Sequence, residues 1–390
     1  MSERKELQQT ASYFKFVGKA TRLDKDFTYR EAVAEKGKNE GKTYRGLNFG
    51  VKTSDTNEMT VQMFSFEPEK VFLWNSEMAK EAKEKNKEYK GTRVDFDEWY
   101  ENQEKFREDG YAVLQSRIGL ERDEKGNAIS HGLPTFVASK ELYEGLDNGD
   151  SVFVEGNISY SNYEKNGKSE LRTNYNIEKL YITKKPVDFE DEKFKEVTYF
   201  EQQFVFVSAE LVKKEKKAYI TGRTINYTKD FTDVQFVIDY KNPDYDPEDE
   251  ESSETIKALE KLAKNLTKRV KFGDLLKVWG NALNRAIVTE VEDEDDEVED
   301  AASMLGGMSK PQHAQKNTLK SYIQEMQIEG VDEWIVGEYK EEDFVKQSLV
   351  DDDDDDDEED NEEDHKEKKI GSNPFESDED EDEDDDDLPF

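Results

Sequence analysis

The chain has 390 residues, of which 95 are Asp or Glu and 56 are Lys or Arg, so its formal net charge is −39. It contains no cysteine, which excludes disulfides, iron–sulfur clusters and thiolate zinc sites. The length allows two or three domains. The three histidines, His131, His313 and His365, lie far apart in the sequence, and no nucleophile or carboxylate pair stands out. We therefore expect a protein that is not an enzyme and that carries no metal or other cofactor.

The first half of the chain, residues 1–187, begins with a polar segment and then alternates between apolar and polar residues, as strands do. An insertion at about 75–146 interrupts it, with charged helices predicted at Glu77–Tyr89 and Glu98–Asp109. The other elements predicted are strands at 14–17, 47–53, 59–66, 149–157 and 171–183, with a helix at 140–146 before the fourth strand.

The second half, residues 198–291, repeats this plan after a linker at 188–197. The frame Gly-Asp-x-(Val/Leu)-x-Val-x-Gly-Asn occurs at 149–157 and again, without gaps, at 273–281. Phe204–Val207 corresponds in the same way to Phe14–Val17, a hairpin follows at 218–240, and a helix at 255–266 precedes the repeated frame. Three strands, a helix and two strands are the order of the OB fold, a five-stranded Greek-key barrel. The sequence therefore predicts a mainly β protein with two OB-fold barrels.

The C-terminal region is predicted in three parts. Residues 292–317 form an acidic, flexible linker, and 318–349 form a small helical segment that begins with an amphipathic helix at Thr318–Met326. From residue 351 to the end, 25 acidic residues stand against 3 lysines, which accounts for 22 of the 39 net negative charges. Such a segment buries too little apolar surface to offset its ordering entropy, so we expect residues 350–390 to be disordered.

The chain ends in an apolar hook on this charged tether: Asp385, Asp386, Asp387, Leu388, Pro389 and Phe390. This tip closely resembles the tip of bacterial and phage single-stranded DNA-binding proteins, whose pattern is Asp-Asp-Asp-Ile-Pro-Phe, with Leu388 where the family has Ile. The resemblance implies a protein that coats and protects single-stranded DNA in replication, recombination or repair. It also implies that the six tip residues bind partner proteins such as a polymerase, helicase or primase.

The length, the two barrels and the insertion resemble a phage or mobile-element version of this family. The tetramer common in the family is therefore not carried over, and homo-oligomerisation stays open. No apolar run approaches the length of a membrane span, so we expect no membrane partner and a cytoplasmic location, in the host cytoplasm if the protein is phage-encoded.

Binding of single strands without sequence preference needs cations along the phosphates and exposed aromatic side chains that stack on bases. Strand alternation places Leu47, Phe49 and Val51 inside the first barrel and leaves Lys52, Phe64 and Phe66 outside. Tyrosines and cations also cluster around the hairpin tip at 164–169. The predicted DNA-binding residues are Lys52, Phe64, Phe66, Phe153, Tyr160, Tyr163, Lys165, Lys168, Arg172, Tyr175, Tyr219, Arg223, Tyr227, Lys277 and Trp279.

Other functions fit parts of this pattern. Acidic C-termini also serve as solubility tails, chaperone arms and DNA mimics, and in those cases the barrels would bind protein. An OB-fold RNA-binding factor is a second alternative, and a nuclease or polymerase subunit is a third. Preference for single strands would distinguish the first two from the main hypothesis, and metal-dependent turnover would reveal the third.

Overall fold

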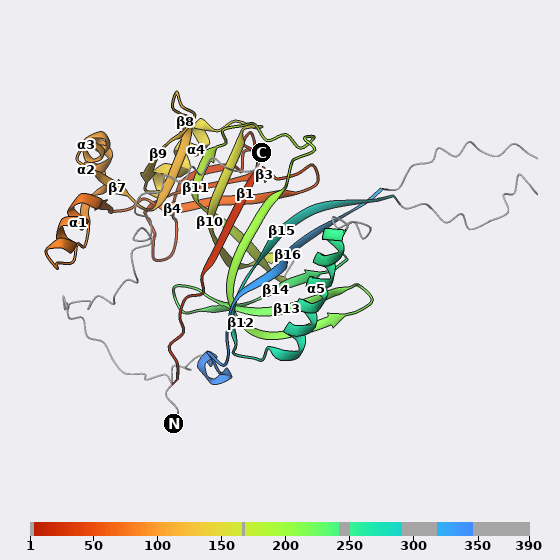
Figure 1. Cartoon of the computed structure of the whole chain (residues 1–390). Helices are drawn as coiled ribbons and strands as arrows, with labels where there is room; N and C mark the ends of the chain where they lie inside the picture. Colours follow the sequence, from red (N-terminus) through yellow and green to blue (C-terminus); the bar gives the residue numbers. More distant parts are fainter. Residues whose placement is uncertain (1–3, 166–167, 242–249, 291–317, 346–390) are drawn as a thin grey trace, which may run out of the picture.

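The computed structural model describes residues 4–165, 168–241, 250–290 and 318–345. Within these ranges the protein is mainly β, with one large mixed sheet of 13 strands and a separate sheet of three (Figure 1). None of the helices described is long and apolar enough to cross a membrane.

Five strands of the first half pair in a closed ring, called ring 1 here. They are β1 (Ser12–Thr21), β3 (Thr43–Lys52), β4 (Glu58–Phe66), β10 (Ser151–Lys165) and β11 (Lys168–Ile182). β1 pairs with β3, β3 with β4, β4 with β11 in parallel, β11 with β10, and β10 with β1. Helix α4 (Thr135–Gly145) precedes β10. The predicted inward residues Leu47, Phe49 and Val51 are at most 1% exposed, so the alternation of β3 is confirmed.

Ring 2 has the same order of pairing. Its strands are β12 (Val197–Val212), β13 (Lys217–Ile225), β14 (Phe231–Asp239), β15 (Leu275–Glu290) and β16 (Thr318–Ile335). β14 pairs in parallel with β16, β16 pairs with β15, and β15 returns to β12. Helix α5 (Glu250–Arg269) precedes β15, in the place that α4 has in ring 1.

The predicted helical segment at 318–349 is wrong. Residues 318–335 form the last strand of ring 2, and only the short 3₁₀ helix η1 (Glu341–Phe344) follows. Ring 2 therefore extends beyond the predicted boundary at residue 291. Leu319, Ile323 and Met326 have helical spacing, but 16 residues of pairing with β15 override this local preference. The predicted linker at 292–317 and tail at 350–390 lie outside the described residues.

The repeated sequence frame has the same structure in both rings. In β10 and β15 the register shifts next to Gly156 and Gly280. A Cβ atom at either glycine would lie 1.9 Å from a backbone oxygen of the neighbouring strand, so no other residue fits there without displacing the strand.

β1 and β12 also pair with each other, antiparallel, and so join the two rings. Phe14 pairs with Gly156 and Phe200 pairs with Gly280, and these two phenylalanines lie opposite each other between the rings. Phe14 therefore corresponds to Phe200, and the predicted match with Phe204 is wrong by four residues. An even shift along an alternating strand preserves the inward face, so the sequence pattern fits both registers.

The insertion forms a small module beside ring 1 (Figure 1). Its sheet contains β5 (Lys70–Asn75), β6 (Thr92–Asp95) and β7 (Tyr111–Val113), and its helices are α1 (Ser76–Glu84), α2 (Phe96–Glu101) and α3 (Gln103–Glu108). β8 (Ser116–Arg122) and β9 (Ala128–Leu133) extend the large sheet from β11, and β2 (Tyr29–Val33) lies on β3. α1 ends earlier than predicted because Asn86, just after its C-cap, has a positive φ of 52°.

Candidate nucleic-acid interface

Three aromatic side chains gather at one end of the outer face of β3 and β4. Tyr44 lies 5.5 Å from Phe64 and 5.9 Å from Phe66, measured between ring centroids, and the two phenylalanines are 5.4 Å apart. Phe64 is 55% exposed, and the guanidinium of Arg30 lies 5.6 Å from the Tyr44 ring. We call Tyr44, Phe64 and Phe66 the aromatic platform. Tyr44 and Phe66 are half-buried next to Phe64, and an exposed ring supported in this way beside a cation suits the stacking of nucleic-acid bases.

Amide side chains lie beside the platform, across β4, β11 and β10. Gln62 donates a hydrogen bond to Asn176 Oδ1 at 3.0 Å, and Asn176 donates to Asn157 Oδ1 at 2.9 Å. The surface beside the platform is therefore polar but uncharged along this row of amides.

Cations stand at the other end of the same face. Lys52 ends β3, and Arg22 follows β1 and donates to Thr60 Oγ1 at 2.7 Å. Two adjoining grooves of about 470 and 320 Å³ share Arg22, Lys52 and Asp55 in their walls. Within the described residues, no group of His, Asp and Glu side chains is arranged to hold a metal ion.

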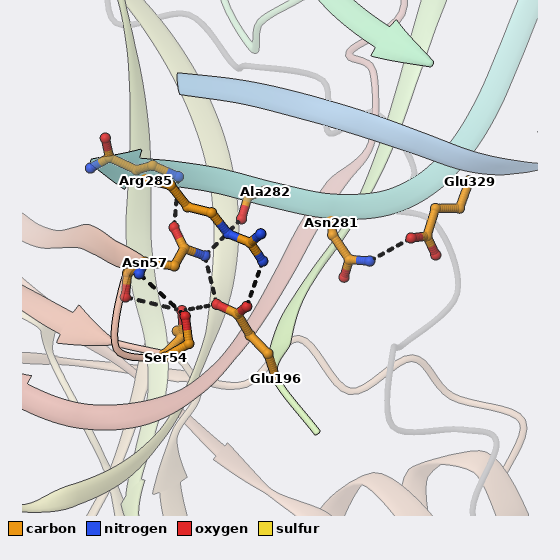
Figure 2. A network of polar contacts seen from close by, with 9 residues as sticks. Ser54, Asn57, Glu196, Asn281, Ala282, Arg285 and Glu329 are labelled. Atoms are coloured by element: carbon orange, nitrogen blue, oxygen red, sulfur yellow. Dashed lines mark hydrogen bonds and ion pairs between the residues drawn. The ribbon is translucent and has the colours of Figure 1, made fainter. Parts of the chain in front are cut away.

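A polar network that includes Asn57 and Asn284 in the wall of the smaller groove joins ring 1 to ring 2 (Figure 2). Glu196, just before β12, accepts hydrogen bonds from Asn57 Nδ2 at 2.7 Å and from Arg285 at 2.8 Å. Asn57 is fully buried in the β3–β4 turn, and its Oδ1 accepts the backbone N–H of Asn284 at 2.7 Å. One carboxylate thus connects the linker, a turn of ring 1 and a strand of ring 2.

Of the predicted residues, Lys52, Phe64 and Phe66 lie on this face, the two phenylalanines side by side and Lys52 at the opposite end of β3. Tyr175 is wrong as a stacking residue: it is 5% exposed and packs 5.3 Å from Phe14 and 4.9 Å from Phe16. The register shift near Gly156 reverses the alternation of β11, which turns Tyr175 inward. Tyr160 is also unsuited to stacking, because its side chain packs against the hydrophobic core and its hydroxyl donates to Gln202 at 3.1 Å.

The remaining predictions are scattered over other surfaces. Tyr163 and Arg172 are exposed on the β10–β11 hairpin, and the predicted side chains of Lys165 and Lys168 lie outside the described residues. Phe153 lies on β10, 5.0 Å from the ammonium of Lys15.

In ring 2 the predicted cations have acidic partners. Arg223 contacts Asp233 at 2.6 Å, and Lys277 contacts Glu201 at 2.6 Å. The other predicted residues there are Trp279, stacked 6.4 Å from Tyr199, Tyr219, which donates to Glu215 at 2.7 Å, and Tyr227, which is 78% exposed. The predicted partner-binding tip, Asp385 to Phe390, lies outside the described residues.

Sequence reasoning missed several residues of this face: Tyr44, Arg30, Arg22, Lys19 and Phe189. Tyr44 has the same parity as Lys52, but the predicted strand began only at Leu47. Extending the alternation three residues toward the N-terminus would have placed Tyr44 beside Phe64.

Comparison with known proteins gives a family and a distant likeness of shape. No curated protein matches the chain. Among solved structures, a crystal structure of a deletion mutant of the single-stranded DNA-binding protein from Thermus aquaticus matches with a TM-score of 0.30 and 13% identity. That match covers 71% of this chain and 89% of the other, and at such a TM-score it carries no argument. The model of the family described as YorF matches residues 83–368. The chain belongs to the YorF family.

Proposed function

We propose that this protein binds single-stranded DNA on the outer face of β3 and β4, and that rings 1 and 2 are two OB folds. The observation that carries the proposal is the aromatic platform with its exposed Phe64 ring. The pairing order supports the OB assignment: each ring has five strands, with a helix before its fourth strand and its third and fifth strands in parallel.

The side chains of this face can stack on bases and pair with phosphates, which are the contacts that single-strand binding requires. Each base stacked on an aromatic side chain contributes about 1–3 kcal/mol, and every base offers a face for stacking, so the sequence of the strand matters little. Neighbouring cations bind the phosphates. The protein would coat and protect single strands in replication, recombination or repair without catalysing a reaction.

Ring 1 carries the main platform in this proposal. At the corresponding open end of the β13–β14 hairpin in ring 2, Lys217 contacts Asp239 at 3.2 Å and Glu325 at 2.8 Å. A cation held by two carboxylates between the strands offers no ring to a base. Ring 2 would therefore contribute mainly to the position of ring 1 and to phosphate contacts.

The acidic C-terminal region has two tasks in the proposal, and the support for both is its sequence alone. Its 22 net negative charges compete with DNA for the cations of the binding face. When DNA displaces it, Leu388, Pro389 and Phe390 become available to partner proteins of replication or repair.

Fluorescence anisotropy with oligo(dT), duplex DNA and RNA of equal length tests the proposal. We expect clear preference for oligo(dT). Equal affinity for the duplex would contradict single-strand binding, and preference for RNA would favour an RNA-binding factor. Absence of binding to all three would favour a protein-binding chain whose acidic region is its active surface.

A further inference from the structure

Two lysines face each other on the outer surface of ring 1. Lys19 of β1 pairs directly with Lys52 of β3 in the antiparallel register, so both side chains lie on the same face. Like charges directly opposite each other in a sheet destabilise it. A third cation, Arg22, stands three residues beyond Lys19 with a φ of 64°, in the left-handed region that costs energy for a residue with a side chain. Residues with strained backbone concentrate at sites that bind ligands.

The three cations line the two adjoining grooves. Lys19, Arg22 and Lys52 line the groove of about 470 Å³, and Arg22 and Lys52 continue into the groove of about 320 Å³. Phe189 of the linker borders the first, and Asn284 of ring 2 borders the second.

Phe189 keeps two of the ammonium groups at the groove. Its ring centroid lies 4.9 Å from Lys19 Nζ and 5.5 Å from Lys52 Nζ. Both cations therefore share one aromatic ring, which draws them toward the same wall.

Acidic residues border the grooves as well. Lys52 contacts Asp55 at 3.2 Å, and Arg22 contacts Glu58 at 2.8 Å. The side chain of Asp55 is 71% exposed, so its ion pair contributes little and a stronger anion can replace it. Asp188 and Glu190 also line the first groove and reduce its positive charge.

We propose that these grooves form a phosphate-binding subsite, in which Lys52, Arg22 and Lys19 hold the backbone of a DNA strand whose bases stack on the aromatic platform. This inference rests on the proposed function. Tyr44 and Lys52 are eight residues apart on β3, about 26 Å at the usual rise of a strand. One bound strand can span that length, because an OB fold covers about 4–16 nucleotides. In the absence of DNA, Asp55 is the ion-pair partner of Lys52, and a phosphate group of the bound strand replaces it.

The test measures oligo(dT) affinity from about 50 to 200 mM salt for the full chain and three variants. Lys52→Met removes a phosphate contact, so we expect affinity to fall about 5- to 10-fold at low salt and the logarithmic salt slope to fall by about 0.7. Asp55→Asn removes the competing carboxylate and should tighten binding about 2- to 5-fold. Lys261→Met, on α5, makes the same charge change away from the grooves and should leave both quantities unchanged. Thermal melting checks that each variant is folded.

The outcomes separate this inference from the function on which it rests. If the unaltered chain does not bind oligo(dT), the proposed function fails. If it binds, but Lys52→Met behaves like Lys261→Met or Asp55→Asn does not tighten binding, the phosphate subsite is refuted and the function stands.

Discussion

Replacing Phe64 with alanine separates binding from folding on the aromatic platform. Phe64 is 55% exposed and touches its two ring neighbours at centroid distances of 5.4 and 5.5 Å. Aromatic pairs contribute about 0.5–1.5 kcal/mol each, and the lower end applies to a ring that is half in solvent. We therefore expect Phe64→Ala to lower the free energy of unfolding by about 1 kcal/mol, which leaves the fold intact.

Phe64→Ala should weaken DNA binding by more free energy than it removes from the stability of the fold. A base that loses its stacking partner loses about 1–3 kcal/mol, which corresponds to an increase in Kd of about 5- to 150-fold. Phe64→Tyr retains a ring and should bind within about twofold of the unaltered chain. Tyr100→Ala is the matched control, because Tyr100 is 51% exposed but lies on α2 of the insertion.

The measurement is the anisotropy of labelled oligo(dT), together with the quenching of tryptophan and tyrosine fluorescence. Thermal melting of each variant is recorded alongside. If Phe64→Ala binds as tightly as Tyr100→Ala while both are folded, base stacking on the platform is refuted. A loss that is equal for Phe64→Ala and Phe64→Tyr would point to shape rather than to stacking.

Three further predictions concern the brace between the rings, the pH dependence of stability and the acidic C-terminal region. Glu196→Ala leaves the donors of Asn57 and Arg285 without their carboxylate, so the free energy of unfolding should fall by about 2 kcal/mol. The free energy of unfolding of Glu196→Gln should lie between those of the unaltered chain and Glu196→Ala. An unchanged melting curve for Glu196→Ala would refute a bracing role. Burial alone would raise the pKa of Asp274, but hydrogen bonds from the backbone N–H groups of Gly337 and Lys271 and from the Trp334 side chain hold it below 3.8. Because the folded pKa is lowered, this stability is present above about pH 4 and is lost as the pH falls below it; Asp274→Asn should therefore flatten the acid-unfolding curve below about pH 4. Deleting residues 351–390 should tighten oligo(dT) binding, and most at low salt. If the deletion leaves the affinity unchanged at every salt concentration of the series, competition by the tail is excluded.

The sequence predicts those parts of the fold that depend on local chemistry. In the repeated Gly-Asp turn, Asp150 accepts the N–H of Asp147 at 2.8 Å, and Asp274 accepts that of Lys271 at 3.1 Å. The glycines that precede these two aspartates have φ values of 98° and 88°. This turn needs only neighbouring residues, so its pattern can be recognised without the structure.

Features that depend on distant partners were predicted less well. Residues 318–335 become a strand because β15 offers them a long edge, and nothing within the segment itself indicates that edge. The inward position of Tyr175 follows from a bulge opposite β10, which local alternation does not reveal. The platform was found only in part for the same reason: Phe64 and Phe66 belong to one strand, whereas Tyr44 joins them through the register of β3 with β4.

The pairing of β1 with β12 also makes the arrangement of the rings independent of protein concentration. Two separate copies of one ring, joined through the same strands, would come apart on dilution, since their association would follow mass action. In this chain the paired residues Phe14 and Phe200 belong to one polypeptide, so the local concentration of each strand near the other is set by the chain that connects them. Any surface that needs both rings is therefore complete in a single molecule, however scarce the protein is.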